Sequence, residues 1–277
     1  MQVSKVFVIA LCLGDEHIAG MLDVAQTFVG NNFPNVETQL LVVDNQLEFT
    51  HESHRFGGVY INGDNSQQEF SGWQRGIDYL TSRFKPSNTD AVVFLNDTVH
   101  RRNYAVGGDR YFEAYRIDDV GPTPQVWAAG YLDDFPAEAS IHGLKFSTWI
   151  RSNLFAMNWT AVQLVSPMVF PCSWDQVFDD TQSDRFWGEQ APMASNWMAY
   201  ISSWLFGAED PSFPEYRLKW IRSEKLSTDN RRYFQSKAIS ILSEHYLSAR
   251  LLKSKVKIFD FNTYPKTPDR HTSPYYN

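Results

Sequence analysis

Carboxylate and amide side chains directly follow three short apolar stretches of the sequence. The carboxyl ends of parallel strands meet at one edge of a sheet, and the ligands of such sheets bind outside that edge. Carboxylate and amide oxygens suit hard cations and nucleotide hydroxyls. The pattern therefore predicts a nucleotide site at a sheet edge. The polar groups are Asp44-Asn45 after residues 40–43, Asn62 to Asn65 after residues 58–61, and Asn96-Asp97-Thr98 after residues 91–95.

The elements that must position these groups alternate between strands and helices. Residues 5–13 form a continuous apolar run, which is typical of a strand covered on both faces. Apolar residues recur at helical spacing over residues 14–30 and 71–84. Alternating strands and helices imply right-handed crossovers, so we predict an α/β, Rossmann-like fold with a mostly parallel sheet flanked by helices.

The second half of the chain is predicted to be a helical C-terminal extension of the same domain. Residues 99–130 are polar and rich in Gly and Arg, which indicates loops, and residues 145–157 predict a further strand. Helical spacing covers residues 191–206 and 231–252, and residues 256–261 end the pattern as a strand or tail. The predicted parts are a nucleotide-binding core (1–160), a helical part (161–262) and an extended or disordered tail (263–277).

Composition and charge exclude several classes of function. The chain has 277 residues, 43% of them hydrophobic, and a formal net charge of -7, which argues against nucleic acid as a partner. Cys12 and Cys172 are its only cysteines, so we expect a reducing compartment and no disulfide. No apolar run is long enough to cross a bilayer, so any membrane contact is expected to be peripheral.

Two segments together resemble the rhamnan-synthesis protein F type of glycosyltransferase and its GT-A relatives. In that family an Asn, an acidic residue four positions on, Phe, two small residues and an aromatic open a helix, and an apolar strand ending in Leu-Asn-Asp-Ser follows. Here Gln67 stands where the family usually has Gly, and the resemblance covers roughly residues 5–160. The matching residues are Asn65, Glu69, Phe70, Ser71, Gly72 and Trp73, then Leu95, Asn96, Asp97 and Thr98.

The resemblance implies a GT-A-like fold and a bacterial-type hexosyl- or deoxyhexosyltransferase. Such an enzyme moves a sugar from a nucleotide-sugar to a glycan or lipid-linked acceptor in cell-surface polysaccharide biosynthesis, on the cytoplasmic side of the membrane. Separately from the resemblance, the aromatic-rich composition of the helical C-terminal half suggests that it supplies the acceptor surface. The residues expected to bind the donor are Asp44, Asn65, Glu69, Ser71, Gly72, Asn96 and Asp97.

Asp97 is the candidate metal ligand, because it stands where GT-A enzymes have the last Asp of their Asp-X-Asp motif. Mg²⁺ or Mn²⁺ there would neutralise the departing diphosphate, and the alternative is neutralisation by positive side chains and helix N-termini. Structural interpretations remain open beside the functional ones. Residues 96–98 would cap the next element, Asp44 would cap a loop, and Ser71 and Gly72 would be small because their helix packs closely on the sheet.

Two acids are candidates for the general base that an inverting transferase needs. Glu189, in Trp187-Gly188-Glu189-Gln190, resembles the Glu-Asp motif of GT-A enzymes with Gln190 in place of Asp. The alternative for Glu189 is an acid favoured by a helix N-terminus. Asp134, next to Asp133, is the second candidate.

Two other functions compete with sugar transfer. The first is a non-catalytic nucleotide- or glycan-binding protein on a degenerate GT-A fold, supported by the single Asp where many relatives have two. The second is an NAD-dependent oxidoreductase, for which Asp44 at a second strand end would suit the ribose. Residues 13–16 lack the Gly-X-Gly-X-X-Gly turn that such an enzyme needs, which disfavours it.

Overall fold

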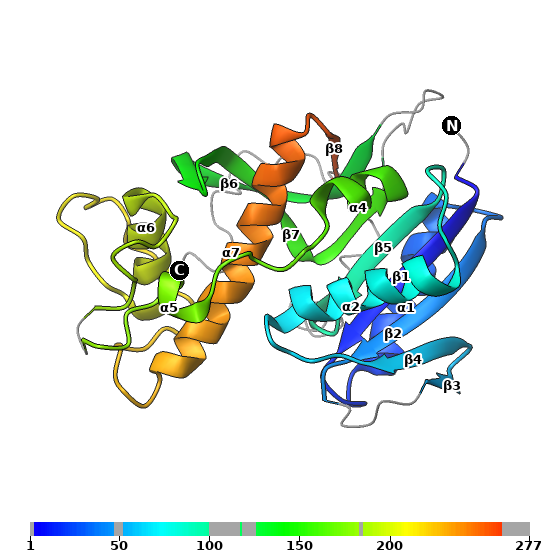
Figure 1. Cartoon of the computed structure of the whole chain (residues 1–277), viewed down its shortest axis with the longest axis horizontal. Coiled ribbons are helices and arrows are strands. Elements are labelled where there is room, and N and C mark those ends of the chain that lie inside the picture. The colour runs from blue at the N-terminus through cyan, green and yellow to red at the C-terminus, as the bar shows by residue number, and fades with distance from the viewer. Residues whose placement is uncertain (1–2, 47–51, 100–116, 118–125, 183–184, 262–277) are drawn as a thin grey trace.

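The chain is built around one mixed eight-stranded sheet with the strand order β3-β4-β2-β1-β5-β7-β6-β8 (Figure 1). The computed structural model describes residues 3–46, 52–99, 117, 126–182 and 185–261. Six strands run in one direction, and β3 and β7 run in the other. The strands are β1 (Lys5–Cys12), β2 (Glu37–Asp44), β3 (Ser53–Arg55), β4 (Gly58–Asn62), β5 (Ala91–Asn96), β6 (Trp127–Ile141), β7 (Leu144–Asn158) and β8 (Lys257–Asp260).

Helices cover both faces of this sheet. Successive side chains of the central strand β1 point to opposite faces, so they enter two different cores. From β1, Val8 packs against the face of α1 (Ile18–Asn32), and Phe7 packs on the other face. That second face is covered by α2 (Gln68–Arg83), α4 (Trp159–Val165) and α7 (Arg231–Lys253). This double burial explains why the β1 sequence is apolar throughout.

A third core lies beyond the sheet, and we call this part the aromatic lobe. It comprises the turn end of the β6–β7 hairpin, α5 (Trp174–Val177), α6 (Ser195–Phe206) and the first half of α7. The hairpin turns at His142 and Gly143, both with positive φ, as a two-residue primed turn requires. In Figure 1, α5 and α6 lie across α7 from β1, β2 and β5.

A wide bulge interrupts β7 beside the end of β5. Gly130 pairs with Phe155 and Leu132 pairs with Ile150, so the four residues 151–154 of β7 lie opposite the single residue Tyr131 of β6. On its other side, β7 pairs Leu154 with Leu95 near the end of β5. Bulges of this kind bend a strand and re-aim side chains, often next to functional sites.

The α/β class with a mostly parallel sheet and flanking helices is confirmed. The sequence-based boundaries differ mainly in three places. Helix α6 begins at Ser195 and not at residue 191, because Met193 forms a bridge to Ile141. Residues 127–130 belong to β6, not to a loop, and residues 159–165 form the unpredicted α4. The predicted tail lies outside the described residues, and in the described part no helix has the length and apolarity to span a bilayer.

Candidate functional site at the carboxyl edge of the sheet

Four parallel strands end at the same edge of the sheet. In the ladder, Asp44 of β2 is the partner of Cys12 of β1, and Asn96 of β5 is the partner of Leu11. The backbone N–H of Asp97 donates to the Leu11 carbonyl at 3.0 Å. We call Asp15, Asp44, Asn96 and Asp97, which surround the end of β1, the rim. Burial first, and then the negative charges of Asp44, Asp97 and Asp15, raise the pKa of the Cys12 thiol, so it stays protonated.

Asp44 is held in the loop-capping role. Asp44 is only 3% exposed, and its Oδ1 accepts hydrogen bonds from the backbone N–H groups of Gly14 (2.9 Å) and Gln46 (2.8 Å). These bonds fix the loop after β1 to the end of β2. Asp44 therefore stabilises the loop conformation at the rim, and its contact with a base or ribose stays a prediction.

The turn after β5 is capped by Asn96. Asn96 Oδ1 accepts from the Thr98 backbone N–H at 3.1 Å and from the Thr98 hydroxyl at 2.5 Å, and Asn96 is 6% exposed. The capping interpretation is therefore right for Asn96 and Thr98. Asp97 itself lies half-buried at the rim, directly after the strand.

The first turn of α2 packs tightly against β1 and the β2 end. Asn45 Nδ2 donates to Asn65 Oδ1 and to the Gln68 carbonyl, both at 3.1 Å. Ser71 Oγ accepts from the Gln67 backbone N–H at 3.1 Å. A Cβ atom on Gly72 would lie 2.0 Å from Leu11 Cδ1, so residue 72 is small because of close packing. The predicted helix start is confirmed, whereas ligand binding by Asn65, Ser71 and Gly72 stays a prediction.

Glu69 and Glu244 meet around Ser152 of the bulge. Glu69 Oε1 accepts from the Ser240 hydroxyl at 2.8 Å and, more weakly, from the Ser152 hydroxyl at 3.4 Å. Glu244 Oε1 accepts from the Ser152 backbone N–H at 2.5 Å. Burial raises the pKa of Glu244, and the nearby Glu69 charge adds to this, while the Ser152 bonds oppose it.

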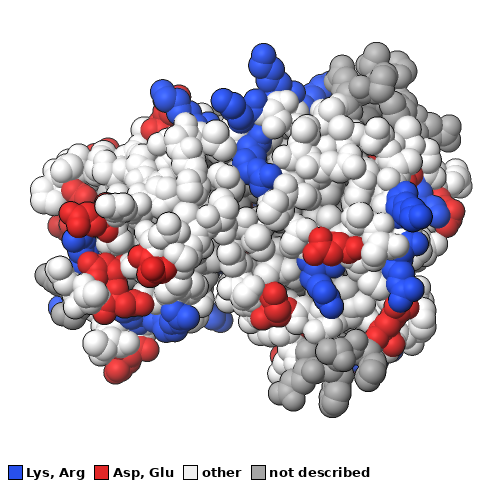
Figure 2. Space-filling view, viewed as in Figure 1, with Lys and Arg blue, Asp and Glu red and all other residues white. Residues whose placement is uncertain are grey.

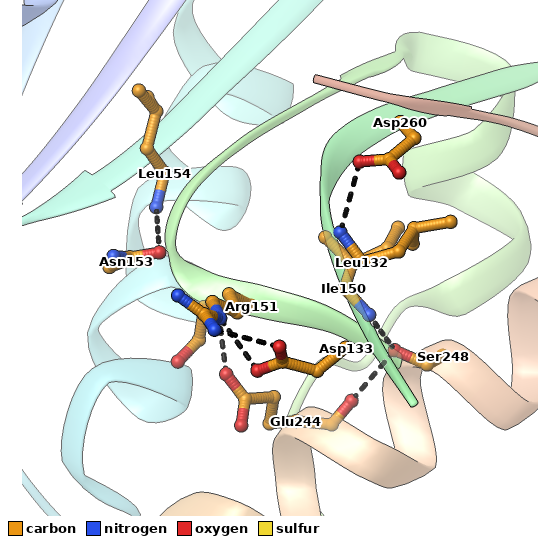
Figure 3. Close-up of polar contacts among 10 residues, drawn as sticks. Leu132, Asp133, Ile150, Arg151, Asn153, Leu154, Glu244, Ser248 and Asp260 are labelled. Atoms are coloured by element: carbon orange, nitrogen blue, oxygen red, sulfur yellow. Dashed lines mark hydrogen bonds and ion pairs between the residues drawn. The ribbon is translucent and has the colours of Figure 1, made fainter. Parts of the chain in front are cut away.

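The side chains of α7 replace the strand partners that the bulge lacks (Figure 3). The Ile150 backbone N–H donates to Ser248 Oγ at 3.0 Å, and the Ser248 hydroxyl donates to the Glu244 carbonyl at 3.1 Å. Buried backbone N–H groups need partners, so Glu244 and Ser248 allow the bulge to exist. Sequence analysis assigned Glu244 to no site; only the register of β6 against β7 reveals its role.

The bulge, which adjoins the end of β5, also carries a basic side chain. Arg151 forms a bidentate ion pair with Asp133, with Nε–Oδ2 and Nη2–Oδ1 distances of 2.6 and 2.7 Å. Its guanidinium carbon lies 4.2 Å from the centre of the Tyr131 ring. The two charged side chains are 18% and 30% exposed. Sequence analysis missed Arg151, because a strand prediction alone does not say where a bulge falls.

Two buried amide atoms near this edge have no hydrogen-bond partner. Across residues 3–46, 52–99, 117, 126–182 and 185–261, the buried side-chain atoms without one are Asn45 Oδ1, Asn153 Nδ2 and Tyr60 Oη. Asn45 lies against the first turn of α2, and Asn153 lies in the bulge and uses Oδ1 to accept from the Leu154 N–H (Figure 3). Buried polar atoms are normally hydrogen-bonded, so these two amide atoms are exceptions at this edge.

Neither candidate general base is brought to the rim. Glu189 is exposed in a turn whose Gly188 N–H donates to the Val177 carbonyl at the end of α5, in the aromatic lobe. It lies six residues before α6, so the helix N-terminus interpretation is wrong. Asp134 is exposed on β6 opposite Thr148.

The rim offers little protein ligation for a metal. In the part of the chain that the structure describes, no three His, Cys, Asp or Glu side chains are grouped to hold an ion. Asn96 Oδ1 is used by Thr98, and one Asp44 oxygen is used by backbone N–H groups. Asp97 alone still fits Mg²⁺ or Mn²⁺, because such ions are commonly held by one carboxylate together with substrate phosphates and water.

Two open pockets border α2, away from its first turn. A pocket of about 480 Å³ adjoins the end of β4, and its walls include Asn62, Arg75, Tyr79 and Arg83. A second, of about 420 Å³, lies between α2 and α4. The first pocket is lined by acidic as well as basic side chains, and the surface that lines the second is mainly apolar. Neither pocket therefore favours an anionic ligand.

Comparison of the chain with protein-family models, with curated proteins and with solved structures finds no significant match. A fold alone does not identify a function. Function is therefore inferred from the chemistry of the rim.

Proposed function

We propose that the protein is a glycosyltransferase that binds a nucleotide-sugar at the rim and transfers the sugar to a glycan or lipid-linked acceptor. The observation that carries this proposal is the half-buried Asp97 at the end of β5, next to Asp44 and Asp15 around β1. With the resemblance of residues 65–73 and 91–98, this arrangement favours a GT-A type of donor site over other Rossmann-like sites.

The chemistry required at the rim is stabilisation of the departing diphosphate. Asp97 would contribute by holding Mg²⁺ or Mn²⁺ against the phosphate oxygens, which supplies positive charge where negative charge develops. Arg151, at the neighbouring bulge, is the nearby cation that would assist, and its ion pair with Asp133 fixes its orientation. Neither Glu189 nor Asp134 lies at the rim, so the proposal covers donor binding and leaves the general base unassigned.

Donor hydrolysis and transfer provide the test. Wild type would be incubated with nucleoside diphosphate sugars with and without Mn²⁺, alongside Asp97→Ala. Asp210→Ala is the matched control, because Asp210 caps a turn in the aromatic lobe. We expect turnover in wild type and in the control and a loss of at least a hundredfold in Asp97→Ala. Equal turnover in all three proteins would contradict the assignment of the donor site.

A non-catalytic nucleotide- or glycan-binding protein is the second candidate. It is favoured by the single Asp of the motif where many relatives have two, and by the commitment of Asp44 to loop capping. A nucleotide that raises the melting temperature of wild type but is neither hydrolysed nor used for transfer would select this candidate. A response to nicotinamide cofactors alone would select the oxidoreductase.

A further inference from the structure

A positively charged surface covers the end of α7, in a chain whose net charge is -7. Residues 247–259 contain four cations and no acidic residue. Figure 2 shows Lys and Arg gathered at the upper edge of the molecule over this end of α7, and an acidic side chain appears beside them only farther along that edge, to the left. We call Lys253, Lys255 and Lys257, with the exposed Leu164 and Leu252, the α7 patch.

Two leucines are exposed within this patch. Leu164, at the end of α4, is 45% exposed, and Leu252, in the last turn of α7, is 38% exposed. Arg250 holds the two helix ends together, because its guanidinium donates to the carbonyls of Leu164, Ser166 and Pro167. The leucines are therefore presented from a fixed surface, not from a loose loop.

Helix capping does not account for all of these charges. A cation in the last turn of a helix interacts favourably with its dipole, and this explains Lys253. Lys255 and Lys257 lie beyond the helix, and Lys255 has a positive φ of 54°. Both are exposed. Lysine side chains around exposed leucines match the headgroup and acyl layers of a bilayer, since lysines reach the phosphates while the aliphatic groups enter the apolar region.

We infer that the α7 patch docks the protein on a membrane surface that contains anionic lipids. A glycan or a nucleic-acid backbone would meet the lysines but offers no acyl layer to receive the leucines. The lysines attract the surface from within a Debye length, and the leucines add a contact that salt does not screen. Docking is thus reversible and needs both components.

The patch and the rim lie at opposite edges of the sheet. Lys257 pairs with Trp127 at the amino ends of β8 and β6, whereas the rim is at the carboxyl ends of β1, β2 and β5. The eight residues of β1 extend over about 26 Å. Docking through the patch therefore turns the rim toward the water. If the proposed function holds, the acceptor is the outer end of a long glycan chain and not a sugar at the headgroup.

Vesicle co-sedimentation of the full chain tests the docking surface. The vesicles would be phosphatidylcholine alone or phosphatidylcholine with about a third phosphatidylglycerol, at low and high salt. The patch variant is Lys253→Gln, Lys255→Asn and Lys257→Gln; Asn is chosen at 255 because it tolerates positive φ. The matched control, Arg217→Gln, Lys219→Gln and Arg222→Gln, removes the same charge from the aromatic lobe, where all three residues are exposed.

We expect wild type and the control to bind the anionic vesicles and the patch variant to bind about a hundredfold more weakly, at about fivefold for each cation. Leu164→Ser with Leu252→Ser should weaken binding several-fold and leave its salt dependence unchanged. Equal losses in the two triple variants, equal binding to neutral vesicles, or binding only to a soluble polyanion such as dextran sulfate would each overturn the proposal. Donor hydrolysis, measured without vesicles, is independent of these outcomes.

Discussion

The rim and the aromatic lobe both bury polar groups, but they do so in different ways. In the lobe, His245 is 2% exposed, packs against Trp149, and accepts a hydrogen bond on Nδ1 from Trp197 Nε1 at 2.8 Å. Burial lowers the pKa of His245 to about 3, so it is neutral and its environment is closed. At the rim, Asp97 is half-buried, Asp15 is exposed and Asp44 is buried, and two amide atoms near the rim and in the bulge lack partners.

This difference implies that polar groups in the two regions respond differently to substitution and to ligands. A closed, neutral and fully bonded polar group contributes to stability and has no means of meeting a ligand. Partly exposed carboxylates and unsatisfied amides carry an energetic cost that a ligand can remove. Substitutions in the lobe should therefore change stability most, and substitutions at the rim should change binding most.

The largest effect on stability is expected from Trp197→Ala in the lobe. Trp197 is 0% exposed, and its removal leaves a cavity and takes the donor away from His245. We expect the free energy of unfolding to fall by about 3–5 kcal/mol, measured by urea denaturation. A loss below about 1 kcal/mol would show that the lobe is loosely packed and would remove the contrast with the rim.

Acid should unfold the protein partly through His245. Its pKa is about 3 in the folded state and about 6.5 in the unfolded state, so the unfolded state takes up the proton first as the pH falls. The stability is present above about pH 6.5 and decreases by about 1.4 kcal/mol per pH unit toward pH 3. His245→Phe should make the curve shallower between pH 6 and 4, at the cost of the Trp197 bond. Identical slopes in both proteins would refute this assignment.

The bulge should depend on Glu244 to an intermediate degree. Glu244→Ala leaves the Ser152 N–H without its acceptor, which should cost about 1–3 kcal/mol. Glu244→Gln keeps an acceptor oxygen and should cost less. Because the pKa of Glu244 is raised in the folded state, its stabilising contribution is full at acid pH and is lost as the pH rises above about 4.5. The free energy of unfolding of Glu244→Gln should therefore rise relative to that of wild type as the pH increases. A relative rise toward acid pH would contradict this.

The smallest effect on stability is expected from Asp97→Asn at the rim. Asp97 is half-buried, and its backbone N–H bond to the Leu11 carbonyl is unchanged by the substitution. We expect a change of less than about 0.5 kcal/mol in the free energy of unfolding, together with loss of the melting-temperature rise caused by nucleotide-sugars. A large destabilisation would mean that Asp97 is structural, like Asn96.

The sheet could be predicted from the sequence because local patterns determine it. The apolar run of β1 and the helical spacing of α2 each follow from burial by neighbours that any α/β fold supplies. The positions of the rim residues at the strand ends could be predicted for the same reason, because they directly follow these apolar runs. Arg151 and Glu244 could not be predicted, because their positions depend on a register shift between β6 and β7 and on a helix about a hundred residues away along the chain. The place of Glu189 beside α5 could not be predicted either, because a likeness in four residues does not fix a position in space.

Hydrogen exchange with and without a nucleotide-sugar measures the central claim most directly. A nucleotide-sugar that raises the melting temperature would be added to wild type, and exchange would be followed by mass spectrometry. We predict slower exchange at the end of β5 and in the first turn of α2, in peptides covering residues 91–97 and 65–72, and no change in α5 and α6. Slower exchange confined to the aromatic lobe would contradict a donor site at the rim.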